Sequence, residues 1–382
     1  MAFSQALSGL SAASTDLNVV SNNISNSQTV GFKSSTTQFA DVYSGADVGL
    51  GTQVSGVVQN FESGSLTTTD NALDLAINGD GFFTFSDGTQ TVYSRNGQLT
   101  LTADGYLENA AGDQLQGVNG VIQIPTTGMQ ASASTELDAE LNLDASDDII
   151  TTTFDQTDSS TYSYSTSATL YDSLGTSHTS TLYFSKTADN TWDVHTAIDG
   201  NLLTDSQTVS FSSSGLITSG ETGTYTYDPA NGAASMSVAL DLTGTTQFGN
   251  DSAVSDITQN GYTSGSLVSF SIDETGTVVA TYSNDQTKNI DQIQLATFSN
   301  ENGLKANGDN TWLATTSSGQ ALLGVASSGS LGSILSGTTE DSNVDLTAEL
   351  VNLIIAQRNF QANAKSVTAQ SEVLQQAVNI GS

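Results

Sequence analysis

The two ends of the 382-residue chain carry the pattern that most constrains its fold: apolar residues spaced alternately four and three positions apart. From residue 345 to residue 379 there is no proline or glycine, so this spacing predicts one long helix with a heptad repeat. Such a helix would be roughly 50 Å long. Its apolar heptad positions are Leu346, Leu350, Leu353, Phe360, Ala364, Val367, Leu374 and Val378.

The N-terminal segment repeats the same alternation, which predicts a second amphipathic helix. Its heptad positions include Phe3, Leu7, Leu10, Leu17 and Ile24. An amphipathic helix gains nothing by exposing its apolar stripe, so each of the two needs a partner. Two arrangements fit the periodicity equally well: a helical hairpin within one chain that covers the β body, or a terminal coiled coil that packs against copies of the chain in a polymer.

We name twelve of these apolar positions the seam residues and predict that they form an assembly seam. They are Phe3, Leu7, Leu10, Leu17, Ile24, Leu346, Leu350, Leu353, Phe360, Val367, Leu374 and Val378. Arg358, Lys365 and Glu372 stand seven residues apart, one residue after the heptad positions Gln357, Ala364 and Ser371. This polar stripe faces away from the seam, either as a solvated face or as a possible inter-subunit contact with acids of a neighbouring subunit.

The rest of the chain is typical of β structure. Only 12% of the residues are charged and only two are prolines, and the polar surface is mostly Ser, Thr, Asn, Gln and Gly. Leu73, Leu75 and Ile77 alternate with polar or small residues, and Asn-Gly and Asp-Gly pairs follow at hairpin spacing. We therefore predict a mixed, mainly β fold: a terminal α-helical coiled coil, formed by the N- and C-terminal helices, with nested discontinuous all-β domains.

Changes in composition predict four parts. Residues 1–32 plus 340–382 form the helical coiled-coil domain, and 33–70 form an extended connector with one short strand. Residues 71–130 plus 260–339 form an all-β core, into which an acidic all-β outer domain, 131–259, is inserted as a sandwich or barrel. The inserted segment has 18 acidic residues and one basic residue, Lys186.

The charge balance excludes several classes of partner. Seven basic and 40 acidic residues give a formal net charge of −33, whereas nucleic acids and anionic membranes both require a basic surface. No segment is apolar enough for membrane insertion, and the first ten residues lack the basic region of a secretory signal. We expect the chain to be cytoplasmic or to leave the cell without a cleaved signal peptide.

Candidate catalytic and metal-binding residues are few. Cysteine is absent, which excludes disulfides and thiolate metal sites. His178 and His195 have Asp172 and Asp193 nearby in sequence, but a hydrolytic triad also needs a placed nucleophile and an oxyanion hole. The acids between Glu136 and Asp148 lack the spacing of a calcium loop. We predict no catalytic, cofactor-binding or metal-binding residues and no enzymatic activity.

Three stretches of the sequence are distinctive: Ser21-Asn22-Asn23-Ile24-Ser25-Asn26 with Gly31-Phe32-Lys33; Asn71–Ile77 with Gly81-Phe82-Phe83 and Tyr93–Gly97; and Glu349–Asn352 with Ala356–Phe360. Together they resemble the signatures of the rod and hook group of bacterial flagellar axial proteins. Ser25 replaces the alanine usual in the first signature. The resemblance covers both termini and both flanks of the 131–259 insertion, and the chain length favours the hook proteins within this group.

The resemblance implies a structural subunit that polymerises with itself into a flexible tube and transmits torque from rod to filament in motility. It further implies export through the flagellar type III apparatus, an extracellular location in the flagellum, and contacts with rod, hook-filament junction and hook cap proteins. The alternatives are a distal rod or hook-associated axial protein, or, in a different class, a secreted β-rich adhesin.

Overall fold

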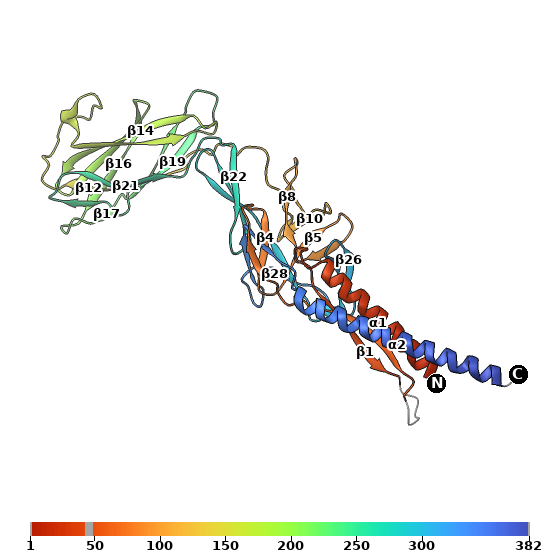
Figure 1. Ribbon diagram of the computed structural model, residues 1–382. Coiled ribbons are helices and arrows are strands. Elements are labelled where there is room, and N and C mark those ends of the chain that lie inside the picture. The colour runs from red at the N-terminus through yellow and green to blue at the C-terminus, as the bar shows by residue number, and fades with distance from the viewer. Residues whose placement is uncertain (1, 43–48, 381–382) are drawn as a thin grey trace. The chain divides into compact units, whose positions relative to one another are not determined.

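The computed structural model describes residues 2–42 and 49–380, and the chain divides into two compact units (Figure 1). Unit 1 comprises Met1–Thr126, Phe270–Ala280 and Lys288–Ser382, and unit 2 comprises Thr127–Ser269 and Thr281–Thr287. The prediction of a mainly β chain with a helix near each end is confirmed. The division into four parts stays a prediction, since unit 1 combines the helices, the connector and most of the predicted β core.

Helices α1 (Ala2–Ser25) and α2 (Leu346–Ile380) lie side by side and antiparallel in unit 1, so that α1 begins near the end of the pair at which α2 finishes (Figure 1). Asp345 caps α2, because its Oδ1 accepts hydrogen bonds from the backbone N–H groups of Thr347 and Ala348 at 2.9 and 3.1 Å. The two helices therefore form a hairpin-like pair within one chain, although some 320 residues separate them in sequence.

The segment predicted as an extended connector contains a β-hairpin. Strand β1 (Ser35–Asp41) pairs antiparallel with β2 (Thr52–Gln59), and both strands contact α1. Only β2 carried a hydrophobic signal in the sequence. The sole large apolar residue of β1 is Phe39, so alternation could not reveal this strand.

The main sheet of unit 1 joins segments from either side of unit 2 in sequence. β25 pairs with β5 through Leu295 and Phe83, and β27 pairs with β6 through Trp312 and Tyr93. Its strands are β5 (Phe82–Ser86), β6 (Thr91–Ser94), β8 (Thr100–Leu101), β9 (Leu107–Glu108), β10 (Gln114–Gly117), β11 (Gly120–Val121), β25 (Gln294–Thr297), β26 (Lys305–Gly308), β27 (Thr311–Leu313) and β28 (Leu322–Val325).

Smaller sheets complete this part of the chain. One joins β4 (Asp74–Asn78), β7 (Gly97–Gln98) and β29 (Ser333–Ser336), and another joins β3 (Leu66–Thr68) and β30 (Thr338–Glu340). A third joins β22 (Leu267–Ile272), β23 (Thr277–Tyr282) and β24 (Thr287–Gln292), along which the chain passes from one unit to the other. Two single turns of 3₁₀ helix span Ser159–Thr161 and Glu301–Gly303.

Unit 2 is a sandwich of two five-stranded sheets. The first contains β12 (Glu136–Asp144), β18 (Thr222–Tyr227), β19 (Met236–Asp241), β20 (Thr246–Phe248) and β21 (Ala253–Gln259). The second contains β13 (Tyr164–Tyr171), β14 (Ser177–Ala188), β15 (Thr191–Ile198), β16 (Asn201–Phe211) and β17 (Ile217–Ser219). Residues of β12 alternate strictly between buried and more exposed, so the acidic side chains point outward while Leu137, Leu141 and Leu143 enter the core.

We predict that the sandwich core determines the stability of unit 2. Leu141→Ala should lower the free energy of unfolding by about 2–5 kcal/mol, because Leu141 is 1% exposed and its removal leaves a cavity. Leu202→Ala is the matched control: Leu202 is 43% exposed, and its change should cost less than about 0.5 kcal/mol. Urea unfolding followed by fluorescence would measure both, and equal effects would contradict the assigned core.

Candidate assembly surface

The contact between α1 and α2 follows a heptad repeat of small and medium-sized residues. On α2 a heptad series of partly or fully buried residues runs through Glu349, Leu353, Ala356, Phe360, Asn363, Val367 and Gln370, and Ala364 beside it is also partly buried. On α1 the most buried residues are Ala6, Ala12, Ala13, Val20 and Asn23. The helices approach closely at Gly9, where an added Cβ atom would lie 2.9 Å from Asn363 Oδ1. The small residues of α1 therefore set the spacing of the pair.

The seam residues divide between this contact and the surface. Leu10, Leu17, Ile24, Leu353, Phe360 and Val367 are half-buried, whereas Phe3, Leu7, Leu346, Leu350 and Leu374 are exposed. Val378 lies outside the residues whose side chains are described. The buried series on α2 shares only Leu353, Phe360 and Val367 with the twelve seam residues. The assignment of the seam to assembly stays a prediction.

The first turns of α2 carry a surface that we call the apolar band: Leu346, Leu350, Val351, Ile354 and Ile355. Each of these side chains is 45–52% exposed. Leu353 and Ala356, on the side that faces into unit 1, are half-buried and buried. Around residues 350–356 the helix is therefore apolar on nearly its whole circumference, and a helix of that kind is normally buried on all sides.

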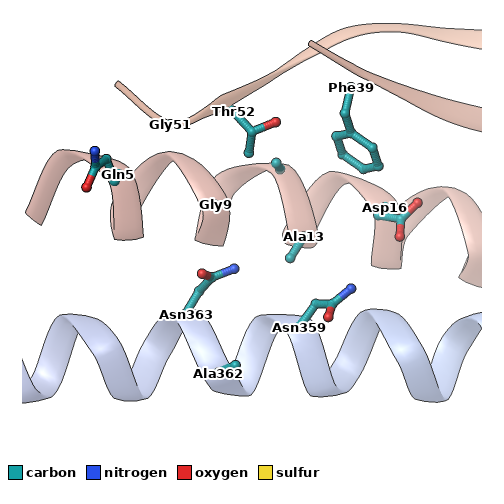
Figure 2. Close-up of a pocket in the computed structure, with 11 residues that line it drawn as sticks. Gln5, Gly9, Ala13, Asp16, Phe39, Gly51, Thr52, Asn359, Ala362 and Asn363 are labelled. Atoms are coloured by element: carbon teal, nitrogen blue, oxygen red, sulfur yellow. The ribbon is translucent and has the colours of Figure 1, made fainter. Parts of the chain in front are cut away.

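Two grooves flank the helical pair. The larger, of about 500 Å³, lies between α1, α2 and the β1–β2 hairpin. In Figure 2, Asn359 and Asn363 point from α2 toward α1, while Phe39, Gly51 and Thr52 lie on the opposite side of α1. The smaller groove, of about 230 Å³, is lined by residues of α1, β1 and the first turns of α2, including Asp16, Thr37 and Glu349.

A buried cluster of three charges connects the helices to the β sheets of unit 1. The Lys33 Nζ donates to Glu340 Oε1 and to the backbone oxygen of Glu62, both at 2.7 Å, and Arg95 Nη1 lies 3.6 Å from Glu340 Oε2. The side chains of Lys33 and Glu340 are fully buried and that of Arg95 is nearly so. Burial lowers the pKa of Lys33, and the Glu340 carboxylate only partly offsets this effect.

The same cluster joins four chain segments. Lys33 follows α1, Glu340 precedes α2, Arg95 follows β6, and the N–H of Gly64 donates to Glu340 Oε1 at 2.8 Å. Arg95 also donates to the backbone oxygen of Gly79 at 2.8 Å. Lys33 and Arg95 stand in the signature stretches of the sequence, but Glu340 is one of 40 acidic residues and carried no signal.

Asparagines complete the junction by hydrogen-bonding to backbone groups. The buried Asn23 side chain donates to the oxygen of Ser35 and accepts from its N–H, which fixes the end of α1 to the start of β1. Asn343, just before α2, accepts from the N–H of Ser34 and donates to the backbone oxygens of Asn60 and Glu62. The hydrogen bonds of Asn23 hold the last turn of α1 against β1, which gives a structural reason for part of the Asn-rich signature.

The predicted polar stripe is fully on the surface. Arg358, Lys365 and Glu372 are exposed, and no ion pair involves them among the residues that the structure describes. Arg358 follows the buried Ala356 by two residues, about 200° around the helix, so it faces away from the interior of the unit. Its inter-subunit role stays a prediction.

The two histidines of unit 2 have different environments. His178 is buried, with Nδ1 2.6 Å from Asp199 Oδ2 and Nε2 3.3 Å from Asp172 Oδ2. Burial alone would lower the pKa of His178, but the hydrogen bonds to both carboxylates outweigh burial and raise it. Burial alone would raise the pKa of Asp172 and of Asp199, but hydrogen bonds to the two carboxylates outweigh burial and lower both pKa values. The hydrogen bond from Asn231 has the largest such effect on Asp172, and that from His178 has the largest on Asp199.

His195 instead stacks on Phe154, with ring centroids 4.1 Å apart and an interplanar angle of 7°. Burial lowers its pKa, and Asp193 opposes this shift. Among the described residues, the hydrogen bonds of His178 go to Asp172 and Asp199, and neither histidine is hydrogen-bonded to a serine or threonine hydroxyl. Within residues 2–42 and 49–380, no three His, Asp or Glu side chains form a group that could hold a metal ion.

No helix in the described part of the chain is both long and apolar enough to cross a membrane.

Four family models match successive parts of the chain. They are the flagella basal body rod protein at residues 4–33, the flagellar hook protein FlgE/F/G D1 domain at 76–150, the flagellar basal body protein FlaE D2 domain at 141–262, and the flagellar basal body rod FlgEFG protein C-terminal region at 335–380. With a helix near each end and β sheets between them, these matches define a flagellar axial protein.

Similarity over the full length identifies the family within this class. The chain is 43% identical to the flagellar hook protein FlgE of Salmonella typhimurium and to that of Escherichia coli K12, with 100% of each sequence covered in both comparisons. The chain therefore belongs to the flagellar hook protein FlgE family, a family of structural proteins of the flagellum. The shorter distal rod protein and the adhesin are disfavoured accordingly.

The fold is also similar to a solved structure. The crystal structure of the Helicobacter pylori flagellar hook protein FlgE2 matches with a TM-score of 0.55 and 15% identity, covering 70% of this chain and 98% of that one. At this identity the likeness concerns the fold alone.

We predict that the buried ion cluster stabilises unit 1 strongly. Glu340→Gln should lower the free energy of unfolding by about 3–5 kcal/mol, because Lys33 and Arg95 would be left buried without a countercharge. Glu62→Gln is the control, since its side chain is exposed and only its backbone oxygen binds Lys33. Chemical denaturation would compare the variants, and an unchanged unfolding midpoint for Glu340→Gln would contradict a stabilising role.

We also predict a pH dependence of unit 2 that arises from His178. Because its pKa is raised in the folded state, its contribution to stability is complete below the unfolded value of about 6.5 and is lost as the pH rises through the folded value. His195 has the opposite effect on the pH dependence of stability. Because its pKa is lowered in the folded state, its contribution is complete above the unfolded value and is lost as the pH falls. His178→Gln should therefore remove the stability loss that sets in as the pH rises above about 6.5, measured as the difference in unfolding midpoint from the wild type. An unchanged profile would contradict the assignment.

Proposed function

We propose that the chain is the structural subunit of the flagellar hook, which polymerises with copies of itself into a flexible tube and transmits torque from rod to filament. The observation that carries the polymerisation is the apolar circumference of α2. One side of this helix is covered within the chain, while the apolar band remains exposed. A second copy of the chain that covers the band removes this apolar surface from water.

The β surfaces fit a tube whose outer contacts change as it bends. In β12 the acidic side chains point outward, and unit 2 has one buried apolar core of its own. Contacts between such polar surfaces are weaker and more hydrated than contacts between apolar helices, so neighbouring subunits can slide. In this proposal the helices hold neighbouring subunits together, and the β-sheet surfaces slide past one another when the tube bends.

The proposal includes partners and a location that rest on family resemblance. The subunit leaves the cell through the flagellar type III apparatus without a cleaved signal peptide and assembles outside the cell. It contacts the rod at one end of the hook, the hook-filament junction proteins at the other, and the hook cap during assembly. Neither nucleic acid nor membrane insertion has a part in this function.

We predict that Ile354→Asp blocks assembly while leaving the monomer folded. Ile354 is 50% exposed in the single chain, so the change should alter its unfolding by less than about 0.5 kcal/mol. In a polymer that buries the band, an unpaired carboxylate is costly and should prevent tube formation. Electron microscopy of assembled protein and the motility of cells would measure the effect.

Val118→Asp provides the control, because it places the same charge on an equally exposed apolar residue, in the turn between β10 and β11 rather than on α2. Its tubes should form normally. Normal tubes and full motility with Ile354→Asp would contradict the assignment of the apolar band to subunit contacts.

A further inference from the structure

The smaller groove beside the helical pair contains buried oxygen atoms to which no described residue hydrogen-bonds. Glu349 Oε2 and Thr37 Oγ1 are buried atoms without a hydrogen-bond partner, and both residues line the groove together with Asp16. The orphan N–H groups at the start of α2 already bind Asp345, so Glu349 is not needed as a cap. Buried acceptors without donors are costly, and two in one groove indicate a missing donor.

The matching donors lie exposed on another face of the same helix. Only seven residues of the chain are basic, and Arg358 and Lys365 are both exposed on α2 without an ion pair among the described residues. Arg358 cannot reach its own chain's groove, because it stands nine residues beyond Glu349, roughly 13 Å along the helix, and on another side of it. A donor from this helix can therefore enter the groove only from a second copy.

We propose that the guanidinium of Arg358 from a second copy of the chain enters the groove between α1, β1 and α2 and binds Glu349, Asp16 and Thr37. This inference rests on the proposed polymerisation and names one contact within it. The planar guanidinium has five donors and serves several acceptors at once, as this groove requires. The contact joins two different surfaces, so it repeats from copy to copy, and it generates an open helical polymer when the rotation between copies does not close a ring.

Arg358 fits this role better than Lys365 because of its neighbours. Val351 and Ile354 of the apolar band lie on the same side of α2, two turns and one turn before Arg358, respectively. Ile355, another member of the band, lines the groove itself. A second copy that packs its band against this rim brings Arg358 to the groove, whereas Lys365 is surrounded by Gln361, Thr368 and alanines.

A charge exchange tests the contact. Arg358→Glu should raise the critical concentration for assembly of the purified full-length chain by about 30-fold or more, since it removes one partner of a buried charged contact. Adding Glu349→Arg to the same chain should lower the critical concentration at least about tenfold from that of Arg358→Glu alone. Lys305→Glu, the same charge reversal on an exposed residue of β26, should change the critical concentration by less than about threefold. Circular dichroism should show unchanged helix content in each variant.

Disulfide trapping gives a second readout, because the chain has no cysteine of its own. Arg358→Cys combined with Glu349→Cys should form a ladder of cross-linked chains in hooks on cells treated with copper phenanthroline as oxidant. Each single variant should remain uncrosslinked. The two positions in one chain are too far apart to bridge, so each cross-link reports a second copy.

The outcomes separate this contact from the proposed function. Hooks that form with wild-type stability in Arg358→Glu, or a double-cysteine variant that gives no ladder in intact hooks, would overturn the contact and leave polymerisation standing. A wild-type chain that forms no tubes, in cells or after purification, would overturn both.

Discussion

The structure of unit 1 depends on three charges that are buried together. Lys33, Glu340 and Arg95 come from the segment after α1, the segment before α2 and the main sheet. Such ions are expensive to remove from water and are tolerated only when each has its partners in place. The cluster therefore favours one arrangement of the helices against the β strands, because other arrangements leave at least one buried charge unpaired.

The packing of α1 against α2 leaves part of the surface of α2 uncovered within one chain. Small residues of α1 allow close packing at Gly9 and Ala13, and this contact covers one side of α2. The other side keeps large aliphatic residues exposed, next to a groove with unused acceptors. A monomer with both features is an incomplete structure whose remaining contacts come from identical chains.

The sequence predicted the features that are periodic or local and missed those that depend on distant partners. Heptad spacing over many turns revealed both helices, alternation revealed β4, and composition indicated an all-β domain where unit 2 lies. β1 was missed because Phe39 is its only large apolar residue, and its strand character comes from pairing with β2. The four-three repeat alone did not settle which helix face is covered, because α2 is apolar on several sides. The role of Glu340 and the unused oxygen of Glu349 follow only from tertiary contacts.

The separation of Lys33 and Glu340 along the chain has a consequence for biosynthesis. These residues are 307 positions apart. At ordinary translation speeds of about 5–20 residues per second, Lys33 is synthesised roughly 15 to 60 s before Glu340. During that interval the junction between α1 and the sheets cannot close without burying an unpaired cation. The nascent N-terminal segment is thus kept from premature docking, and the order of synthesis makes this junction one of the last parts of the molecule to form.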